Sequence, residues 1–225
     1  MKLTLYNGSP RKKKSITRIM LEKFAEGYRE GKQEDSETTE ISLHYLKDIK
    51  NTEEHVKAFA DADVVVIGFP LYTDAMPAIV KHFIEALPAL DDVSGKKIGF
   101  IVHSGFPEVK HSTFVERYLK RLTERLGCEY LGTLIKGSSE GVRLMPDSMN
   151  KKLFSVLDSL GHCLAEKGKF DPVLIAELRK PYTFSKWAIL GLRLLAFLGI
   201  TNSYWNSNLK KHNAYDKRFD RPYAP

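Results

Sequence analysis

The sequence predicts an α/β fold: a doubly wound parallel sheet of five strands, followed by a helical extension. Two observations predict it. Apolar runs of strand length alternate five times with segments whose apolar residues recur at helical spacing, the pattern of strand–helix–strand units. The run DVVVIGF at residues 63–69 is a continuous stretch rich in β-branched side chains, typical of a strand buried on both faces of a parallel sheet. A chain of 225 residues is long enough for one such domain and an extension.

The individual elements follow from the same two periodicities. Residues 2–6 alternate as a strand, residues 16–28 carry apolar side chains at helical spacing, and the polar, turn-rich segment 31–40 leads to the next strand. Pro77 suits the first turn of one helix, and Gly127 suits the C-terminal cap of another. We expect the remaining strands at residues 41–46, 63–69, 96–104 and 129–137, and the remaining helices at 53–60, 76–87, 113–127 and 149–168.

The pattern changes near residue 170, so we expect a main domain at residues 1–168 and an extension at 169–225. Residues 170–181 suit one short helix, and residues 187–200 are apolar except for Arg193. A membrane-spanning helix needs about 20 apolar residues, so this run is too short to span. It is a helix packed on the domain, a dimer-exchange arm, or an amphipathic segment resting on a membrane surface. Packing on the chain itself or on a partner is favoured, because an exposed apolar patch promotes aggregation.

Charge and cysteine content narrow the function classes. Thirty-five Lys and Arg against 28 Asp and Glu give a net charge of +7, which favours an anionic partner. The cations are scattered and no recognition motif is present, so we expect no nucleic-acid partner. Cys128 and Cys163 lack the spacing of a metal site or a disulfide framework and are expected in or near the core, so we expect no metal. With no recognisable export signal at the N-terminus, these features favour a cytoplasmic location.

The first loop, GSPRKKKSIT, carries hydroxyl side chains and cations between a strand and a helix N-terminus, an arrangement suited to holding a phosphate. The Walker pattern and the spaced glycines of the dinucleotide fingerprint are both absent, which argues against ATP and against NAD bound in the usual Rossmann manner. Arg11 is expected to reach the phosphate, while Lys12, Lys13 and Lys14 point to solvent and raise the local potential. The alternative is a plain turn with solvated lysines.

The loop PLYTDAMP at residues 70–77 follows the third strand. It places an aromatic ring, a hydroxyl, a carboxylate and a thioether at the carboxyl edge of the sheet, where ligands of open parallel sheets bind. Tyr72 can offer a stacking face to a flat heterocycle, and the loop backbone can offer donors to its carbonyl edge. The alternative is that Tyr72 packs on the neighbouring helix.

Both loops, in this order, resemble the NADPH-dependent FMN reductase and flavodoxin-like oxidoreductase family, whose members carry a Gly-Ser-Pro-Arg loop and a Pro-Leu-Tyr-x-x-x-Met-Pro loop. The resemblance extends over the residues from 1 to about 165 and implies a flavodoxin-like fold, strand order 2-1-3-4-5, and one non-covalent FMN. Two departures stand out. The compact cysteine motif of the iron–sulfur members is missing, and the chain is basic whereas small electron-carrier flavodoxins are acidic. The second favours a reductase that takes electrons from an anionic nucleotide.

The resemblance also implies site residues. The phosphate-binding loop corresponds to Ser9, Arg11, Ser15, Ile16 and Thr17. The loop along the isoalloxazine edge corresponds to Pro70, Leu71, Tyr72, Thr73 and Met76. The loop after the fourth strand adds His103, Ser104, Gly105 and Phe106 as cofactor contacts, and residues 137–141 can close the pocket.

The implied activity is an FMN-dependent NAD(P)H oxidoreductase. It passes hydride from NAD(P)H as co-substrate through FMN to a small-molecule acceptor (a quinone, an azo or nitro compound, or a flavin) with ping-pong kinetics, and we expect a homodimer. No side chain is assigned a catalytic role; His103 and Glu108 are candidate proton donors, but a structural role is favoured for His103. The alternative is an FMN-binding redox sensor or electron-transfer protein without fast NAD(P)H turnover. The acceptor and the preferred nucleotide stay open.

Overall fold

The computed structural model describes residues 2–32, 40–87 and 95–221. Its core is a five-stranded, all-parallel sheet in the order β2-β1-β3-β4-β5, which confirms the predicted fold class and strand order. The strands are β1 (Leu3–Asn7), β2 (Ile41–Tyr45), β3 (Val64–Pro70), β4 (Lys97–His103) and β5 (Glu129–Lys136).

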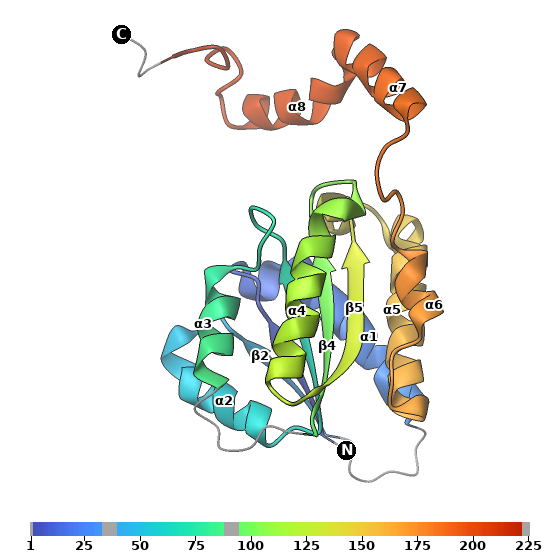
Figure 1. The fold of residues 1–225 in the computed structure, drawn as a ribbon. Helices are drawn as coiled ribbons and strands as arrows, with labels where there is room; N and C mark the ends of the chain where they lie inside the picture. Colours follow the sequence, from blue (N-terminus) through green and yellow to red (C-terminus); the bar gives the residue numbers. More distant parts are fainter. Residues whose placement is uncertain (1, 33–39, 88–94, 222–225) are drawn as a thin grey trace. The chain divides into compact units, whose positions relative to one another are not determined.

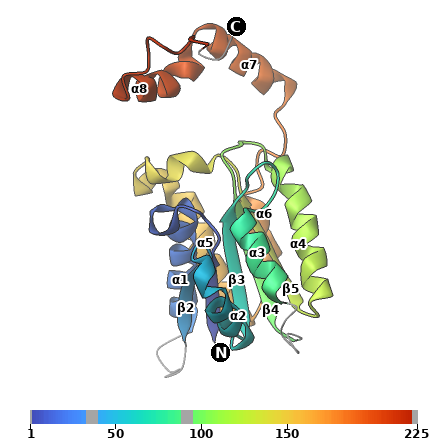
Figure 2. The ribbon, with the colours of Figure 1, turned by 90° about the vertical axis from the view of Figure 1, so that its left-hand side faces the viewer.

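Helices cover both faces of the sheet, as Figures 1 and 2 show. One face packs against α1 (Ile16–Gly31), α5 (Asp147–Lys167) and α6 (Pro172–Glu177). The other face packs against α2 (Thr52–Ala60), α3 (Ala78–Ala86) and α4 (Thr113–Arg125). The alternation of side chains along each strand divides the core accordingly. In β3, Val64 and Val66 point to the α1–α5 face, whereas Val65, Ile67 and Phe69 point to the α2–α4 face. Because helices cover both faces of the sheet, successive residues of a central strand are all buried, which explains the continuous apolar runs of the sequence.

The tightest helix contact joins α1 to α5, and two glycines make it possible. A Cβ added at Gly161 would lie 2.0 Å from the Phe24 carbonyl oxygen, and one added at Gly27 would lie 1.9 Å from the Asp158 carbonyl oxygen. Real Cβ atoms do not approach backbone this closely, so the two helices could not reach their observed separation with any other residue at these positions.

The element boundaries agree with the sequence to within a few residues. Pro77 is the N-cap residue of α3 and not part of its first turn, and Gly127 follows α4 with the left-handed φ of 68° expected at a helix end. Both cysteines are buried, as expected. In the segment expected as a polar connection, residues 33–39 lie outside the described residues.

The chain divides into two compact units, residues 1–183 and 184–225, so the first unit extends past the expected boundary at residue 168. The helix α6 belongs to the first unit because it packs on α5 and β5. The second unit contains α7 (Lys186–Phe197), a 3-10 turn at Ile200–Asn202 and α8 (Ser203–Lys211).

No residue of α7 is buried within the second unit, so packing inside this unit does not account for its apolar side chains. Within residues 2–32, 40–87 and 95–221, no single helix is both long and apolar enough to cross a membrane. The segments Lys186–Phe197 and Ile200–Lys211 meet that length and composition only together, and they are bent by 77° at the break between them.

Candidate functional site

The carboxyl ends of four strands meet at one edge of the sheet and define the candidate site. Pro70, His103 and Lys136 form one row, because β3, β4 and β5 pair in register at their last residues. Asn7, the last residue of β1, lies beside Gly68 of β3. The loops that follow these strands enclose a recess whose lining residues are Ser9, Arg11, Ile16, Pro70, Leu71, Tyr72, His103, Ser104, Gly105, Ser139 and Glu140.

The first loop is organised by Asn7. Its Nδ2 donates to Ser15 Oγ (3.0 Å) and its Oδ1 accepts from the Ser9 backbone N–H (2.9 Å). Ser15 is the N-cap of α1: its hydroxyl donates to the Lys12 carbonyl oxygen (2.6 Å) and accepts from the Arg18 N–H (3.1 Å). The Ser15 hydroxyl therefore uses its one proton and both lone pairs within the protein, and its part in the site is to shape the loop.

What the loop presents to the recess is the start of α1 and one guanidinium. The first N–H groups of a helix have no partner inside the helix, and those of Ile16 and Thr17 have no acceptor among the hydrogen bonds of the described residues. The Arg11 side chain lines the recess, and none of the ion pairs of the described residues includes it. A helix N-terminus beside an unpaired cation is suited to an anion such as a phosphate monoester.

The three lysines after Arg11 behave differently from one another. The sequence suggested that Lys12 points to solvent. Instead it forms an ion pair with Asp48, on the connection between β2 and α2. Lys13 and Lys14 are exposed, as expected. The ion pair holds the loop against the neighbouring connection, so only Lys13 and Lys14 are left to raise the potential of the solvent-facing side.

The second loop makes a tight hairpin at its tip. Tyr72 and Ala75 exchange both backbone hydrogen bonds, and Thr73 and Asp74 between them adopt left-handed φ values of 50° and 58°. Non-glycine residues adopt this conformation uncommonly, and it is a feature of two-residue hairpin turns. The turn leaves Tyr72 at the recess with 44% of its surface exposed, which is compatible with a role as a stacking face.

His111 joins the second loop to the loop after β4. Its ring stacks on Phe106, with 4.6 Å between ring centroids, and its Nδ1 lies 3.3 Å from a carboxylate oxygen of Asp74. The Phe106 carbonyl oxygen accepts hydrogen bonds from the Ser138 N–H and the Ser104 hydroxyl. The loops after β3, β4 and β5 are therefore connected by contacts within the protein.

A buried hydrogen-bond chain that includes lining residues of the recess fixes the protonation of His103. The Ser139 hydroxyl donates its proton to the Ser104 carbonyl oxygen (2.9 Å), so its oxygen accepts from His103 Nδ1–H (2.9 Å). The Nε2 atom of His103 then accepts from the Thr17 hydroxyl (2.8 Å). Burial, together with the positive charges of Arg11 and Lys136, lowers the pKa of His103 to about 3. His103, at the end of β4, is a neutral structural residue that links α1 to the segment after β5, and not a proton donor.

This assignment predicts an acid-sensitive fold. The folded-state pKa lies below the unfolded value of about 6.5, so the unfolded chain binds the extra proton first. The contribution of His103 to stability is complete above pH 6.5 and is lost as the pH falls from there toward 3, by at most about 1.4 kcal/mol per pH unit. Urea unfolding of the apoprotein at pH 7, 6 and 5 should show a steeper loss for the wild type than for His103→Gln.

The comparison with the variant is needed because burial also lowers the pKa values of His44 and His55, which titrate in the same direction in both proteins. A wild-type and a His103→Gln protein with the same loss of stability between pH 7 and 5 would contradict a neutral His103 in the folded state.

The structure brings most of the residues expected at the site to one place. Ser15 and Thr17 are buried and do not line the recess, and they bond to Asn7 and His103 respectively. Nine of the expected residues line the recess: Ser9, Arg11, Ile16, Pro70, Leu71, Tyr72, His103, Ser104 and Gly105. Thr73, Met76 and Phe106 are not among the lining residues: Thr73 is in the hairpin turn, Met76 packs against the core, and Phe106 stacks on His111.

Sequence reasoning missed Asn7 and Lys136 and named Ser139 and Glu140 only as part of a segment able to close the pocket. The signal for Asn7 and Lys136 was available: each is the polar last residue of a strand whose other residues are mostly apolar. Half-burial lowers the pKa of Lys136, whose ammonium donates to the Gly137 carbonyl oxygen. Glu140 gives the recess its carboxylate.

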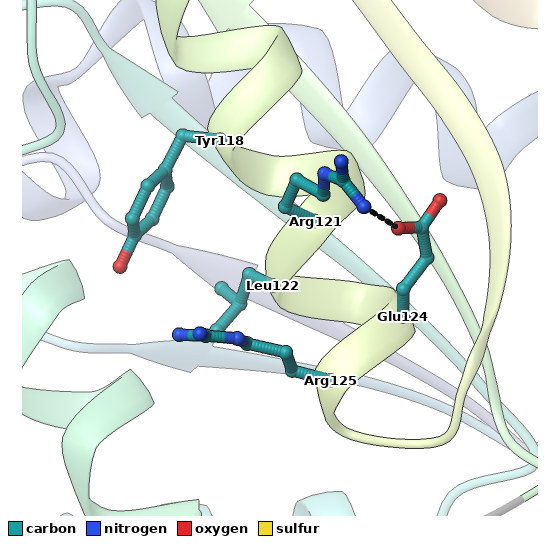
Figure 3. Close-up of a pocket in the computed structure, with 5 residues that line it drawn as sticks. All are labelled: Tyr118, Arg121, Leu122, Glu124 and Arg125. Atoms are coloured by element: carbon teal, nitrogen blue, oxygen red, sulfur yellow. Dashed lines mark hydrogen bonds and ion pairs between the residues drawn. The ribbon is translucent and has the colours of Figure 1, made fainter.

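A second hollow lies on the outer face of α4, as Figure 3 shows, and is lined by Tyr118, Arg121, Leu122, Glu124 and Arg125. Arg121 pairs with Glu124 along the helix (3.5 Å). These residues come from the part of α4 that runs toward the amino ends of the strands, away from the loops of the recess (Figure 1). The α4 hollow is therefore separate from the candidate site.

Comparisons with known proteins agree with this geometry. A family model described as "Flavodoxin-like fold" matches residues 1–153. No curated protein sequence matches the chain significantly. Among solved structures, an FMN-dependent NADH-azoreductase from Bacillus anthracis in complex with FMN is similar at 17% identity and a TM-score of 0.59, over 73% of this chain and 100% of that one.

Two further structures are similar to the same extent. An NAD(P)H:quinone oxidoreductase from Methanothermobacter marburgensis shares 15% identity at a TM-score of 0.57, over 73% of this chain and 96% of that one. An NADPH-quinone reductase from P. pentosaceus shares 17% identity at a TM-score of 0.53, over 74% of this chain and 99% of that one. At such identities the likeness shows the fold.

Proposed function

The chain belongs to the family of the flavodoxin-like fold, and from this premise we propose that it is an FMN-dependent NAD(P)H oxidoreductase that reduces a small acceptor. One observation carries the proposal. Four strand-end loops meet at a recess that is lined by a helix N-terminus, by an exposed aromatic ring, and by a guanidinium that forms no ion pair among the described residues. The similar solved structures include an FMN-dependent NADH-azoreductase and NAD(P)H-dependent quinone reductases, which supports the same class of reaction here.

The residues present fit FMN. Its phosphate would be held by the N–H groups of Ile16 and Thr17 and by the Arg11 guanidinium, with the Ser9 hydroxyl beside them. Tyr72 would offer its ring to the isoalloxazine. The side chain of Ser15 is excluded from this set because its hydrogen-bonding capacity is already used.

Few backbone N–H groups are available to donate hydrogen bonds to the isoalloxazine ring of FMN. The backbone N–H groups of Leu71, Tyr72 and Ser104 already donate within the protein, to His103, Ala75 and Lys136 respectively. Among the lining residues of the loops after β3 and β4, Gly105 is the one with a backbone N–H that has no acceptor among the described residues. Gly105 is therefore the backbone donor available for a flavin carbonyl, and the half-buried Lys136 adds positive charge beneath the recess.

When bound, FMN supplies the redox chemistry, since flavins take hydride from reduced nicotinamides and pass electrons to small acceptors. The protein binds and orients the reactants and needs no acid–base side chain for this. The neutral His103, with both ring nitrogens engaged, is suited to holding the loops in place and not to moving a proton.

We expect ping-pong kinetics, because a single recess requires the nicotinamide to leave before the acceptor enters. Initial rates of NADPH or NADH oxidation, measured at several concentrations of a quinone acceptor with FMN present, should give parallel double-reciprocal lines. Intersecting lines would contradict the shared recess. A protein that binds FMN but does not oxidise either nucleotide would be an FMN-binding redox sensor or electron carrier, and the proposed enzyme activity would fall.

A further inference from the structure

The second unit exposes an apolar surface that nothing in the proposed function uses. Four side chains of α7 recur at the spacing of one helix face and are each more than half exposed: Trp187 (80%), Leu190 (56%), Leu194 (60%) and Phe197 (88%). Monomeric soluble proteins rarely expose contiguous apolar patches of this kind unless the patch binds something. We call this set the α7 apolar face.

The other exposed apolar residues of the second unit extend this surface around α7 and beyond it. They are Ile189, Leu192, Leu195, Leu198, Ile200, Trp205 and Phe219. Exposed apolar side chains therefore also occur in the 3-10 turn, in α8 and in the segment that follows it.

Charge is concentrated in the same unit. Residues 184–225 hold seven cations and two carboxylates, a net charge of +5 out of +7 for the whole chain. The cations are Lys186, Arg193, Lys210, Lys211, Lys217, Arg218 and Arg221. The positive charge of this protein is thus not scattered, as the composition alone suggested, and the first unit is nearly neutral.

Two cations lie among the apolar side chains of α7. Lys186 and Arg193 are seven residues apart and lie on one side of the helix, beside Phe197 at the edge of the α7 apolar face. A hollow on α7 is lined by both cations and by Trp187, Ile189 and Leu190. Long cationic side chains that border apolar surface can reach the headgroup region of a bilayer while the apolar groups enter it.

We propose that the second unit binds the surface of an anionic lipid bilayer, with α7 and α8 lying in the interface. A helix of 12 residues is about 18 Å long, shorter than the hydrocarbon layer of about 30 Å, and α7 is bent by 77° from the segment that follows it. The segments therefore suit a position in the plane of the interface. Both tryptophans of the chain, Trp187 and Trp205, are in this unit, and tryptophan is enriched at membrane interfaces.

The charge of the second unit favours an anionic lipid bilayer over a second copy of the chain, and its apolar side chains favour the bilayer over a nucleic acid. A second copy of the chain seated on the same surface would bring +5 against +5, which opposes association. A nucleic acid would neutralise the cations but leave the leucines and Phe197 in water. The headgroups of an anionic lipid would neutralise the cations, and its acyl chains would take up the apolar side chains. Membrane contact, not favoured from the sequence, therefore becomes the preferred interpretation.

The test uses the full chain with vesicles of phosphatidylcholine, with and without phosphatidylglycerol. Because both tryptophans are in the second unit, tryptophan emission reports on this unit alone. We expect a blue shift and co-flotation with the anionic vesicles, weakened by salt. Phe197→Gln should weaken binding about tenfold or more, whereas Phe114→Gln, the same change at an exposed position of α4 (56%), should leave it unchanged.

A charge pair completes the design. Replacing Lys210 and Lys211 together by glutamine should weaken binding about tenfold. The same double change at Lys151 and Lys152, exposed on α5, should have little effect. Equal binding to vesicles with and without phosphatidylglycerol would overturn the proposal. A second outcome would also overturn it: a protein that sediments as a dimer, does not float with the vesicles, and shows blue-shifted tryptophan emission without lipid. The apolar surface would then be covered by a second copy of the chain.

Discussion

Replacing Gly161 by alanine is expected to destabilise the first unit by about 3 kcal/mol or more. The new Cβ would lie 2.0 Å from the Phe24 carbonyl oxygen and 2.7 Å from the Tyr28 backbone nitrogen, and neither is a flexible group that can move aside. The helices α1 and α5 would have to separate, which would open the core that the α1–α5 face of the sheet shares with them. Urea unfolding followed by far-UV circular dichroism measures the loss directly.

The matched control is Gly191→Ala, in the interior of α7. A Cβ at Gly191 would meet nothing within 4 Å, so the same chemical change should leave the unfolding midpoint of the first unit unchanged. An unfolding midpoint for Gly161→Ala equal to that of the wild type would contradict the close approach of α1 and α5.

Replacing Arg11 by alanine is expected to weaken FMN binding about 10- to 100-fold. The reason is the loss of a charge-assisted hydrogen bond to the phosphate, which is worth more than a neutral one. Arg11 lines the recess beside the first turn of α1, and no carboxylate among the described residues pairs with it. Titration of the apoprotein with FMN, followed by quenching of flavin fluorescence, measures the change.

Lys14→Ala is the control for Arg11, because it removes one positive charge from the same loop at an exposed position. Removing it should change the affinity less than about threefold, since an exposed charge acts only through a screened potential. Equal losses for the two variants would mean that the loop attracts the phosphate by its general charge, and that Arg11 makes no specific contact.

The fold could be predicted because its signals are local and repeated. Five alternations between strand and helix periodicity specify a doubly wound sheet, and the buried run of β3 specifies its centre. The spacing between helices could not be predicted in the same way. In the sequence, Gly27 and Gly161 are only poor helix formers; their reason for being there is a contact between residues more than 130 positions apart.

The candidate site was predictable to the extent that it consists of residues directly after strands. The roles of the individual side chains depend on partners from other loops, and these the sequence does not show. Ser15 and Thr17 look like ligands of a phosphate, yet the first caps a helix and the second bonds to His103. Lys12 looks solvated, yet it pairs with Asp48, 36 residues away.

The second unit illustrates the opposite difficulty. Its apolar run is obvious in the sequence. The net charge of +7 for the whole chain, however, does not show that most of the excess positive charge lies in the same unit as that run. Only the finding that α7 has no buried residue turns the two observations into one surface.

The central claim is that the recess at the carboxyl edge of the sheet binds FMN in a form that NAD(P)H can reduce. Its most direct test is an anaerobic titration of the purified full chain, first with FMN and then with NADPH, followed by visible absorbance. We predict binding of one FMN per chain and loss of the oxidised-flavin bands when NADPH is added. A protein that leaves FMN free in solution would contradict the claim, and the anion held at Arg11 and the first turn of α1 would then belong to some other ligand.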